Sequence, residues 1–176
     1  TGSGTFSNQT PTAVYTPSAA DVTAGSVTIT YTTNDPAGPC PAVNSSFVLS
    51  INPAATVSAG ASFPACSNTP INMNGAFGGG ATAATWSTSG SGTFSNNTPT
   101  AVYTPSAADI SAGSVTISYT TSGQLAPCTP QVGTMVLTIG NAPTVSAGAN
   151  QTICSSSAAV MAGSFGGGAT SATWST

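Results

Sequence analysis

The sequence predicts an all-β fold in which antiparallel β-sandwich repeats of 88 residues follow one another in tandem. The 176 residues align with themselves at this offset without any insertion or deletion. Short segments alternate apolar and polar residues, which is the period of a strand with one buried face. Glycine, proline and asparagine separate these segments, and about seven short strands per repeat suit an antiparallel sandwich.

The 88-residue period is the dominant pattern in the chain, and a fixed period indicates a tandem array. Residues 1–88 differ from residues 89–176 at 33 positions. Aromatic residues and cysteines recur at this offset: Phe6 with Phe94, Tyr15 with Tyr103, Cys40 with Cys128, Cys66 with Cys154, Phe77 with Phe165, and Trp86 with Trp174.

Asparagine and proline cluster near residues 52–53 and 141–143, where we expect linkers between repeats. The predicted complete repeat therefore covers residues 52–140. Residues 1–51 form the C-terminal part of one repeat, and residues 141–176 form the N-terminal part of another. Because a divided sandwich leaves unpaired strands, we expect a segment of a longer polymer, or a subunit whose halves are completed by neighbours.

The clearest strands are SVTISYTT at residues 114–121 and TMVLTI at residues 134–139. In the first, Val115, Ile117 and Tyr119 share one face, and hydroxyl residues occupy the other. The second places apolar residues at 135, 137 and 139 in the same way. Further strands are predicted at 71–74, 84–88, 93–95, 100–104 and 144–146.

One helical turn is predicted within PSAADISAG, residues 105–113. Ser106 and Asp109 have the spacing of a capping box, and Gly113 suits a left-handed exit from the helix. The earlier copy repeats this pattern with Ser18, Asp21 and Gly25. These two aspartates are therefore interpreted as structural, rather than as catalytic or metal-binding residues.

The chain has no Lys, Arg, His or Glu, and its only acidic side chains are Asp21, Asp35 and Asp109. The lack of cations argues against binding to nucleic acid or to an anionic membrane surface. No apolar stretch is long enough to span a bilayer, and we expect any export signal to be removed or to lie upstream. Because the usual acids, bases and oxyanion donors are missing, the sequence also predicts a non-enzyme without a cofactor.

Several segments carry a resemblance to a known family. They are PTVSAGANQTIC, SFGGGATSATWS, SGTFSNNTPTAVYTPSAADISAGSVTISYTT, and APCTP followed by VLTI. Together they resemble the Ig-like or PKD-like tandem repeats of large surface and gliding-adhesin-type proteins of Bacteroidetes-like bacteria. The resemblance covers the whole chain, and that family shares a scaffold rather than a catalytic motif.

The resemblance implies secretion, tandem arrays and an extracellular or cell-surface role as a stalk, fibre or adhesin. The leading hypothesis is a structural repeat of an extracellular filament, whose partners are copies of itself. One alternative is an adhesive module whose loops bind surface glycans or proteins. Another is a strand-exchanged, pilus-like subunit.

The four cysteines suit an oxidising, extracellular setting and allow three pairings. A bridge between Cys66 and Cys128 within the complete repeat is the default expectation. In a standard Ig strand order, however, these positions can lie at opposite ends, too far apart for a disulfide. Bridges would then join successive repeats or neighbouring chains, and Cys40 and Cys154 would find partners outside the chain in either case. No C-x2-C spacing supports a zinc site.

Four asparagines begin N-x-Ser/Thr sequons and are candidate glycosylation sites: Asn8, Asn44, Asn96 and Asn150. The alternative, which we favour, is that Ser, Thr and Asn keep an uncharged chain soluble. The segment FGGGAT at residues 77–82 is interpreted as a flexible connection rather than a phosphate loop, because it lacks a lysine. Trp86 is interpreted as a core residue rather than a sugar-stacking platform.

Overall fold

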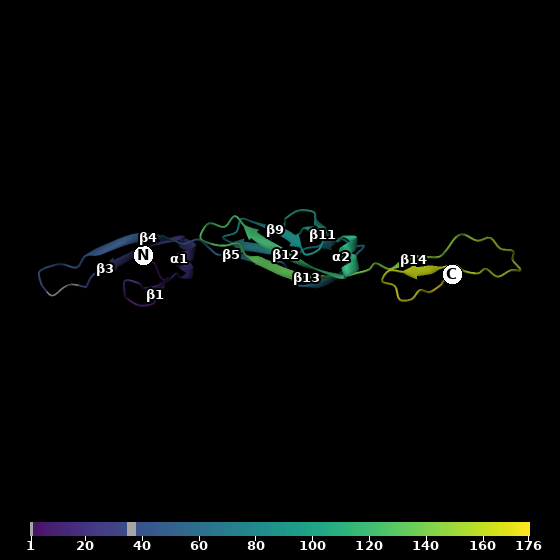
Figure 1. Cartoon of the computed structure of the whole chain (residues 1–176), viewed down its shortest axis with the longest axis horizontal. Helices are drawn as coiled ribbons and strands as arrows, with labels where there is room; N and C mark the ends of the chain where they lie inside the picture. The colour runs from purple at the N-terminus through teal and green to yellow at the C-terminus, as the bar shows by residue number, and fades with distance from the viewer. Residues whose placement is uncertain (1, 35–37) are drawn as a thin grey trace. The chain divides into compact units, whose positions relative to one another are not determined.

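The computed structural model describes residues 2–34 and 38–176 (Figure 1). Residues 2–52 contain β1 (Thr5–Phe6), β2 (Tyr15–Thr16), α1 (Ala19–Ala24), β3 (Ser26–Thr32) and β4 (Asn44–Ser50). Residues 53–140 contain β5 (Ala55–Ser58), β6 (Phe63–Cys66), β7 (Ile71–Asn72), β8 (Ala76–Gly79), β9 (Ala83–Thr88), β10 (Thr93–Phe94), β11 (Val102–Thr104), α2 (Ala107–Ala112), β12 (Ser114–Ser122) and β13 (Val132–Gly140). Residues 141–176 contain β14 (Thr144–Ser146) and β15 (Ser164–Gly166).

The chain forms two compact units. The first unit contains Thr1–Thr56, Gly78–Ala83 and Thr121–Gln131. The second contains Val57–Phe77, Ala84–Thr120 and Val132–Thr176. In both units antiparallel pairing predominates, which confirms the predicted all-β, antiparallel class.

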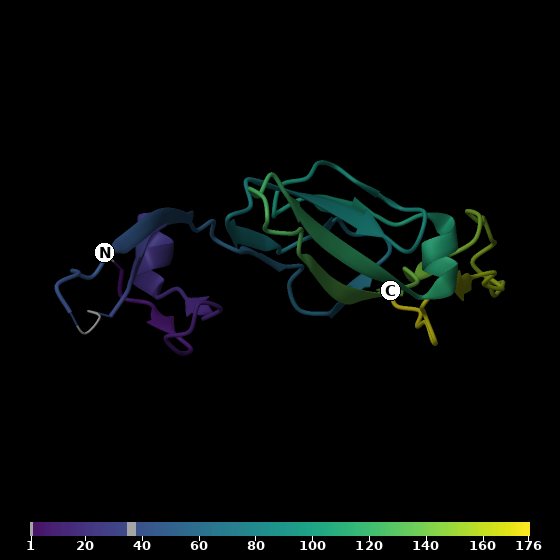
Figure 2. The same ribbon diagram turned by 60° about the vertical axis from the view of Figure 1, so that its left-hand side comes forward.

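The second unit holds the two larger sheets of the central repeat (Figure 2). One sheet has the strand order β6-β13-β12-β9, and the other has the order β10-β11-β7. Strands β12 and β13 pair antiparallel from Ser114 opposite Thr138 to Thr120 opposite Val132. Strand β6 instead pairs parallel to β13, with Phe63 opposite Leu137.

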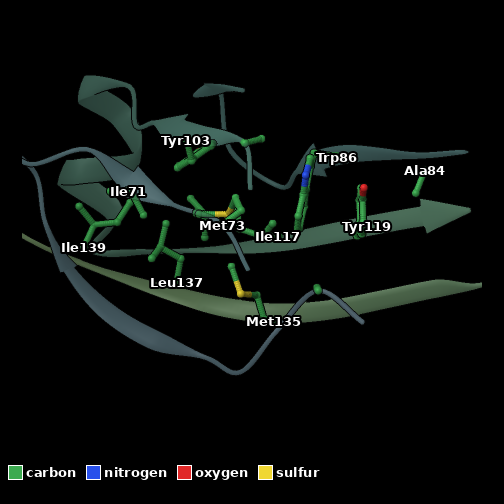
Figure 3. Packing of buried hydrophobic residues seen from close by; sticks show 13 residues of the cluster. Ile71, Met73, Ala84, Trp86, Tyr103, Ile117, Tyr119, Met135, Leu137 and Ile139 are labelled. Atoms are coloured by element: carbon green, nitrogen blue, oxygen red, sulfur yellow. The ribbon is translucent and has the colours of Figure 1, made fainter. Parts of the chain in front are cut away.

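Alternating residues of these strands fill one apolar core (Figure 3). On β12, Val115, Ile117 and Tyr119 are buried, as the two-residue period predicts. Leu137 and the other predicted inward residues of β13 are also buried. The core continues into the second sheet through Tyr103 of β11. The sequence therefore placed the inner faces of both long strands correctly.

In the first unit, strands β3 and β4 repeat the register of β12 and β13. Val27 lies opposite Leu49, just as Val115 lies opposite Leu137 eighty-eight residues later. The backbone N–H of Ile51 donates to the carbonyl of Gly25 at 2.8 Å, which is the distance of the equivalent bond in the central repeat. The partial repeat at residues 2–52 thus keeps the local structure of the complete one.

Both predicted capping boxes are present. The Ser106 hydroxyl accepts a hydrogen bond from the Asp109 backbone N–H, and the Asp109 carboxylate accepts one from the Ser106 N–H. Ser18 and Asp21 are arranged in the same way around α1. Gly113 ends α2 with φ at 75°, a left-handed conformation that glycine adopts without a steric penalty.

The interpretation of residues 77–82 as a flexible connection was wrong for its first half. Strand β8 covers Ala76–Gly79 and pairs with β5, and only the residues after it form the turn. Strand β6 was also missing from the expected strands. Asp35, the third acidic residue, lies outside the residues that the structure describes.

Candidate interaction surfaces

The central repeat is held together by an aromatic stack around Trp86. The Trp86 and Tyr119 rings are nearly parallel, with centroids 4.0 Å apart, and Phe94 stacks on the indole with centroids 5.7 Å apart. The indole N–H of Trp86 donates to the Thr98 carbonyl at 2.9 Å. Gly75 lies so close to the indole that a Cβ atom there would overlap it. Trp86 is 5% exposed, which confirms its interpretation as a core residue.

Two consecutive stretches of chain supply this core. Residues 53–88 contribute five buried side chains: Ala59, Ile71, Met73, Ala84 and Trp86. Residues 89–140 contribute eight: Ala101, Tyr103, Val115, Ile117, Tyr119, Met135, Leu137 and Ile139. Backbone hydrogen bonds also join the two stretches, from Met73 N to Ala101 O at 2.8 Å and from Gly75 N to Pro99 O at 2.9 Å. Neither stretch can bury its apolar face alone.

Residues 2–52 correspond to the second of these stretches, and their apolar face is open. Tyr31 is 54% exposed and Phe47 is 60% exposed, whereas their equivalents Tyr119 and Met135 are buried. A groove of about 350 Å³ follows this face, and we call it the N-terminal groove. Its apolar lining includes Phe6, Pro11, Tyr15, Ile29, Tyr31 and Phe47.

Residues 141–176 correspond to the first stretch, and the apolar side chains that face the second stretch in the central repeat are exposed here. Trp174 is 59% exposed, although its equivalent Trp86 is 5% exposed. Val145, Met161 and Phe165 are also more than half exposed. We call these four side chains the C-terminal apolar face. Sequence reasoning expected unpaired strands in the two partial repeats, but it did not identify these side chains.

A hydrogen-bonded network surrounds each capping aspartate. The Tyr103 hydroxyl donates to Asp109 Oδ2 at 2.8 Å, and the Ser91 N–H donates to Oδ1 at 3.0 Å. Burial alone would raise the pKa of the Asp109 carboxyl, but its hydrogen bonds with Ser106, Ser91 and Tyr103 outweigh burial and lower the pKa to about 2. Burial, together with the neighbouring carboxylate, raises the pKa of the Tyr103 hydroxyl.

The equivalent network at Asp21 has the same donors. The Tyr15 hydroxyl donates at 2.8 Å, and the Ser3 N–H donates at 3.0 Å. The hydrogen bond from the Ser18 backbone is the largest cause that lowers the pKa of the Asp21 carboxyl. Both aspartates therefore join a helix start to a neighbouring loop, which confirms their structural interpretation.

All four cysteines carry free thiols in the structure. Cys66 ends β6 opposite Gly140, the last residue of β13. Cys128 lies in the loop before β13, and its thiol donates to the Asn52 carbonyl at 3.4 Å. Cys40 and Cys154 are exposed. The expected bridge between Cys66 and Cys128 stays a prediction.

The four sequon asparagines are exposed. The side-chain carbonyl of Asn96 accepts hydrogen bonds from the backbone N–H and hydroxyl of Thr98, at 2.8 and 2.6 Å. Asn8 makes the same turn with Thr10, while Asn44 begins β4. Glycosylation at Asn8, Asn44, Asn96 and Asn150 stays a prediction.

Within residues 2–34 and 38–176, no group of three or more His, Cys, Asp or Glu side chains is arranged to hold a metal ion. In the same part of the chain, no helix combines the length and the apolar character that crossing a membrane requires.

Neither a family model nor a curated protein matches the sequence. Among solved structures, the chain is similar to the extracellular domain of protocadherin gamma B4, with a TM-score of 0.39 and 15% sequence identity. The similar region covers 81% of this chain and 27% of that chain.

Proposed function

We propose that this chain is a non-catalytic structural segment of an extracellular filament, fibre or stalk, in which each complete repeat carries tension along the polypeptide. One observation carries the proposal, namely the parallel pairing of β6 with β13. These strands lie near the beginning and the end of the complete repeat. A pull on the two ends of the repeat therefore reaches this strand pair once the short β5–β8 pair has opened.

The direction of pairing decides how the strands resist that pull. Phe63 lies opposite Leu137 and Cys66 lies opposite Gly140, so the strands enter the pair at the same end. The preceding chain pulls β6 from its Phe63 end, while the following chain pulls β13 from its Gly140 end. The strands must then slide past each other, and their hydrogen bonds are loaded together. In an antiparallel hairpin pulled at its open end, the bonds would break one after another.

The chemistry of the surface also supports a structural role. The chain contains no Lys, Arg, His or Glu, and hydrogen bonds within the fold occupy the Asp21 and Asp109 carboxylates. Few side chains are therefore available for acid-base chemistry. The extracellular location, and copies of the chain as partners, are proposed from the resemblance to bacterial surface repeats.

Single-molecule force spectroscopy on the full chain, held at its two termini, tests the proposal. We expect one cooperative unfolding event that lengthens the chain by about 30 nm, as about 88 residues become extended. The Ser67 N–H donates to Gly140 O at 3.0 Å, so in the alternation of a strand the Ala65 N–H points toward β13 as well. Ala65→Pro removes that N–H and should lower the unfolding force.

The adjacent residue provides a matched control. Pro64 has no N–H to donate, so Pro64→Ala should leave the unfolding force unchanged. Unfolding at low force in the parent chain, or an equal response to both variants, would overturn the proposal that the repeat carries tension. Saturable binding of surface glycans to a chain that unfolds at low force would instead favour the adhesive alternative.

A further inference from the structure

We propose that Asn74 is a site of spontaneous covalent modification, which the fold keeps closed and which unfolding of the central repeat opens. The backbone nitrogen of Gly75 and a water molecule would convert the Asn74 side chain to a carboxylate without an enzyme. The inference rests on the contacts of these two residues and holds whether or not the repeat carries tension.

The sequence supplies the reacting groups side by side. Asn74 and Gly75 form the only Asn-Gly pair among the 176 residues. In such a pair the glycine nitrogen can attack the side-chain carbonyl carbon of the asparagine. Glycine hinders this attack least, because it has no side chain and allows the widest range of backbone conformations. The other asparagines all precede residues that carry side chains, so Asn74 should react first.

Water is the only co-reactant that the conversion needs. The Gly75 nitrogen loses its proton and forms a bond to Asn74 Cγ, and the side-chain nitrogen leaves with that proton as ammonia. The product of this step is a cyclic imide. Water then opens the imide at either of its two carbonyl carbons. One opening leaves aspartate, and the other leaves isoaspartate, in which the main chain runs through the former side chain and gains a methylene group.

Hydrogen bonds of the folded chain hold the Asn74 backbone in an extended form that keeps the reacting groups apart. The Met73 N–H donates to the Ala101 carbonyl at 2.8 Å, and the Gly75 N–H donates to the Pro99 carbonyl at 2.9 Å. These bonds flank Asn74 and continue the antiparallel register of β7 with β11. The attack requires the Gly75 nitrogen to lose its proton and turn toward the Asn74 side chain, and both changes break its hydrogen bond.

Packing around the same peptide group also prevents this rotation. A Cβ atom at Gly75 would lie 2.6 Å from Cζ2 of Trp86, so the glycine backbone fits directly against the indole. The Asn74 carbonyl oxygen lies against Gly60, where a Cβ atom would be 2.8 Å from it. The peptide group between Asn74 and Gly75 therefore cannot turn while Trp86 stays in the core.

A second copy of this segment shows that the packing does not need the asparagine. Ala162 is the equivalent of Asn74 in the 88-residue period, and Gly163 follows it. Gly163 lies against the Trp174 indole in the same way. The glycine therefore belongs to the packing of the tryptophan, whereas the Asn74 side chain is exposed. The chain thus supplies its own control variant, Asn74→Ala.

The two products differ in their effect on the fold. Aspartate places a charge on an exposed side chain, which should change the free energy of unfolding little. Isoaspartate instead lengthens the main chain before Gly75. The Gly75 N–H then cannot reach the Pro99 carbonyl in register while Gly75 lies against Trp86. A repeat that carries isoaspartate should therefore fail to refold, which makes its unfolding irreversible.

Peptide mapping of the full, reduced chain tests the site, after incubation in mildly alkaline buffer with and without concentrated urea. A reaction that needs an open repeat is slowed by the fraction of molecules that are open, so we expect Asn74 to convert at least about a hundredfold faster in urea. The chymotryptic peptide that ends at Phe77 gives the extent of conversion by mass, and enzymatic methylation detects its isoaspartate.

Two further variants separate opening of the core from other effects of the solvent. Trp86→Ala weakens the core and should speed the conversion of Asn74 in buffer without urea. Leu125→Ser should leave the rate unchanged, because Leu125 is 67% exposed and lies outside the core. Equal conversion in the folded and unfolded parent chain, or conversion of another asparagine ahead of Asn74 in urea, would overturn the proposal.

Refolding after increasing times in urea tests the consequence of the modification. The parent chain should lose its ability to refold in proportion to the isoaspartate formed, as measured by hydrogen exchange of the β12 amides. Asn74→Ala should lose none over the same period. Asn74→Asp, refolded without incubation, should recover like the parent, because it carries the charge without the longer main chain. Full refolding of chains that carry isoaspartate would refute the predicted irreversibility.

Discussion

Trp86 stacks on Tyr119 with ring centroids 4.0 Å apart and ring planes 16° from parallel. The two residues come from opposite sides of the boundary at residues 88–89 that divides the core into its two stretches. This contact therefore joins the two stretches within the core, whereas Trp174, the equivalent of Trp86, is exposed.

Trp86→Ala should lower the free energy of unfolding of the central repeat by about 3–5 kcal/mol, because it removes a large buried ring and leaves a cavity. Trp174→Ala in the monomeric chain should cost less than about 1 kcal/mol, since its ring is mostly solvated. Urea denaturation, followed by hydrogen exchange of the β12 amides, measures both. Equal costs would contradict the contrast in burial between the two tryptophans.

Gly75→Ala should destabilise the central repeat by about 1–3 kcal/mol, because the new methyl group would overlap the Trp86 indole. Gly113→Ala should cost about 1 kcal/mol for a different reason. Its surroundings are open, but its backbone is left-handed. Adding Trp86→Phe, which replaces the indole with a smaller ring, should relieve part of the cost at residue 75 and none of the cost at residue 113. The denaturation midpoints of the single and double variants test whether the relief is confined to residue 75.

Stability of the central repeat should fall in acid, over a range set by Asp109. Its folded pKa of about 2 lies below the ordinary value of 3.8, so the ionised carboxylate stabilises the fold above pH 3.8. This contribution is lost as the pH falls toward 2. Asp109→Asn should cost about 1–3 kcal/mol at neutral pH, because the amide has one acceptor oxygen for several donors. Trp86 fluorescence during urea titrations from pH 2 to 7 should show a flatter acid response in this variant.

Trypsin should leave the chain intact even after reduction and unfolding, because the sequence contains no Lys or Arg. Chymotrypsin should cut the same unfolded sample at its aromatic residues, which controls for accessibility. Mass spectrometry gives the result directly. Discrete tryptic fragments would show that the chemical structure of the chain differs from its sequence.

The regular alternation of apolar and polar residues made part of this fold predictable from the sequence. Strands β12 and β13 combine regular inward apolar residues with outward hydroxyl residues, and this pattern has few other structural solutions. Strand β6 contains Pro64, and β8 ends in two glycines, so neither has a typical strand composition. Both segments form strands because they pair with a neighbouring strand, β6 with β13 and β8 with β5, although their own composition does not favour a strand.

The interaction surfaces were less predictable. The sequence identified the partial repeats and the equivalence of Trp86 with Trp174, but it did not say which side chains cross between the stretches. The cysteine pairing also remained open in the sequence, since four cysteines allow three connectivities. The structure adds the surroundings of two of them, because the Cys128 thiol contacts the Asn52 carbonyl and Cys66 lies opposite Gly140.

The division of each core between two consecutive stretches of chain also bears on folding during synthesis. Residues 53–88 leave the ribosome before residues 89–140, and their five core side chains stay uncovered until the second stretch follows. At about 5–20 residues per second, each repeat exposes this apolar surface for several seconds.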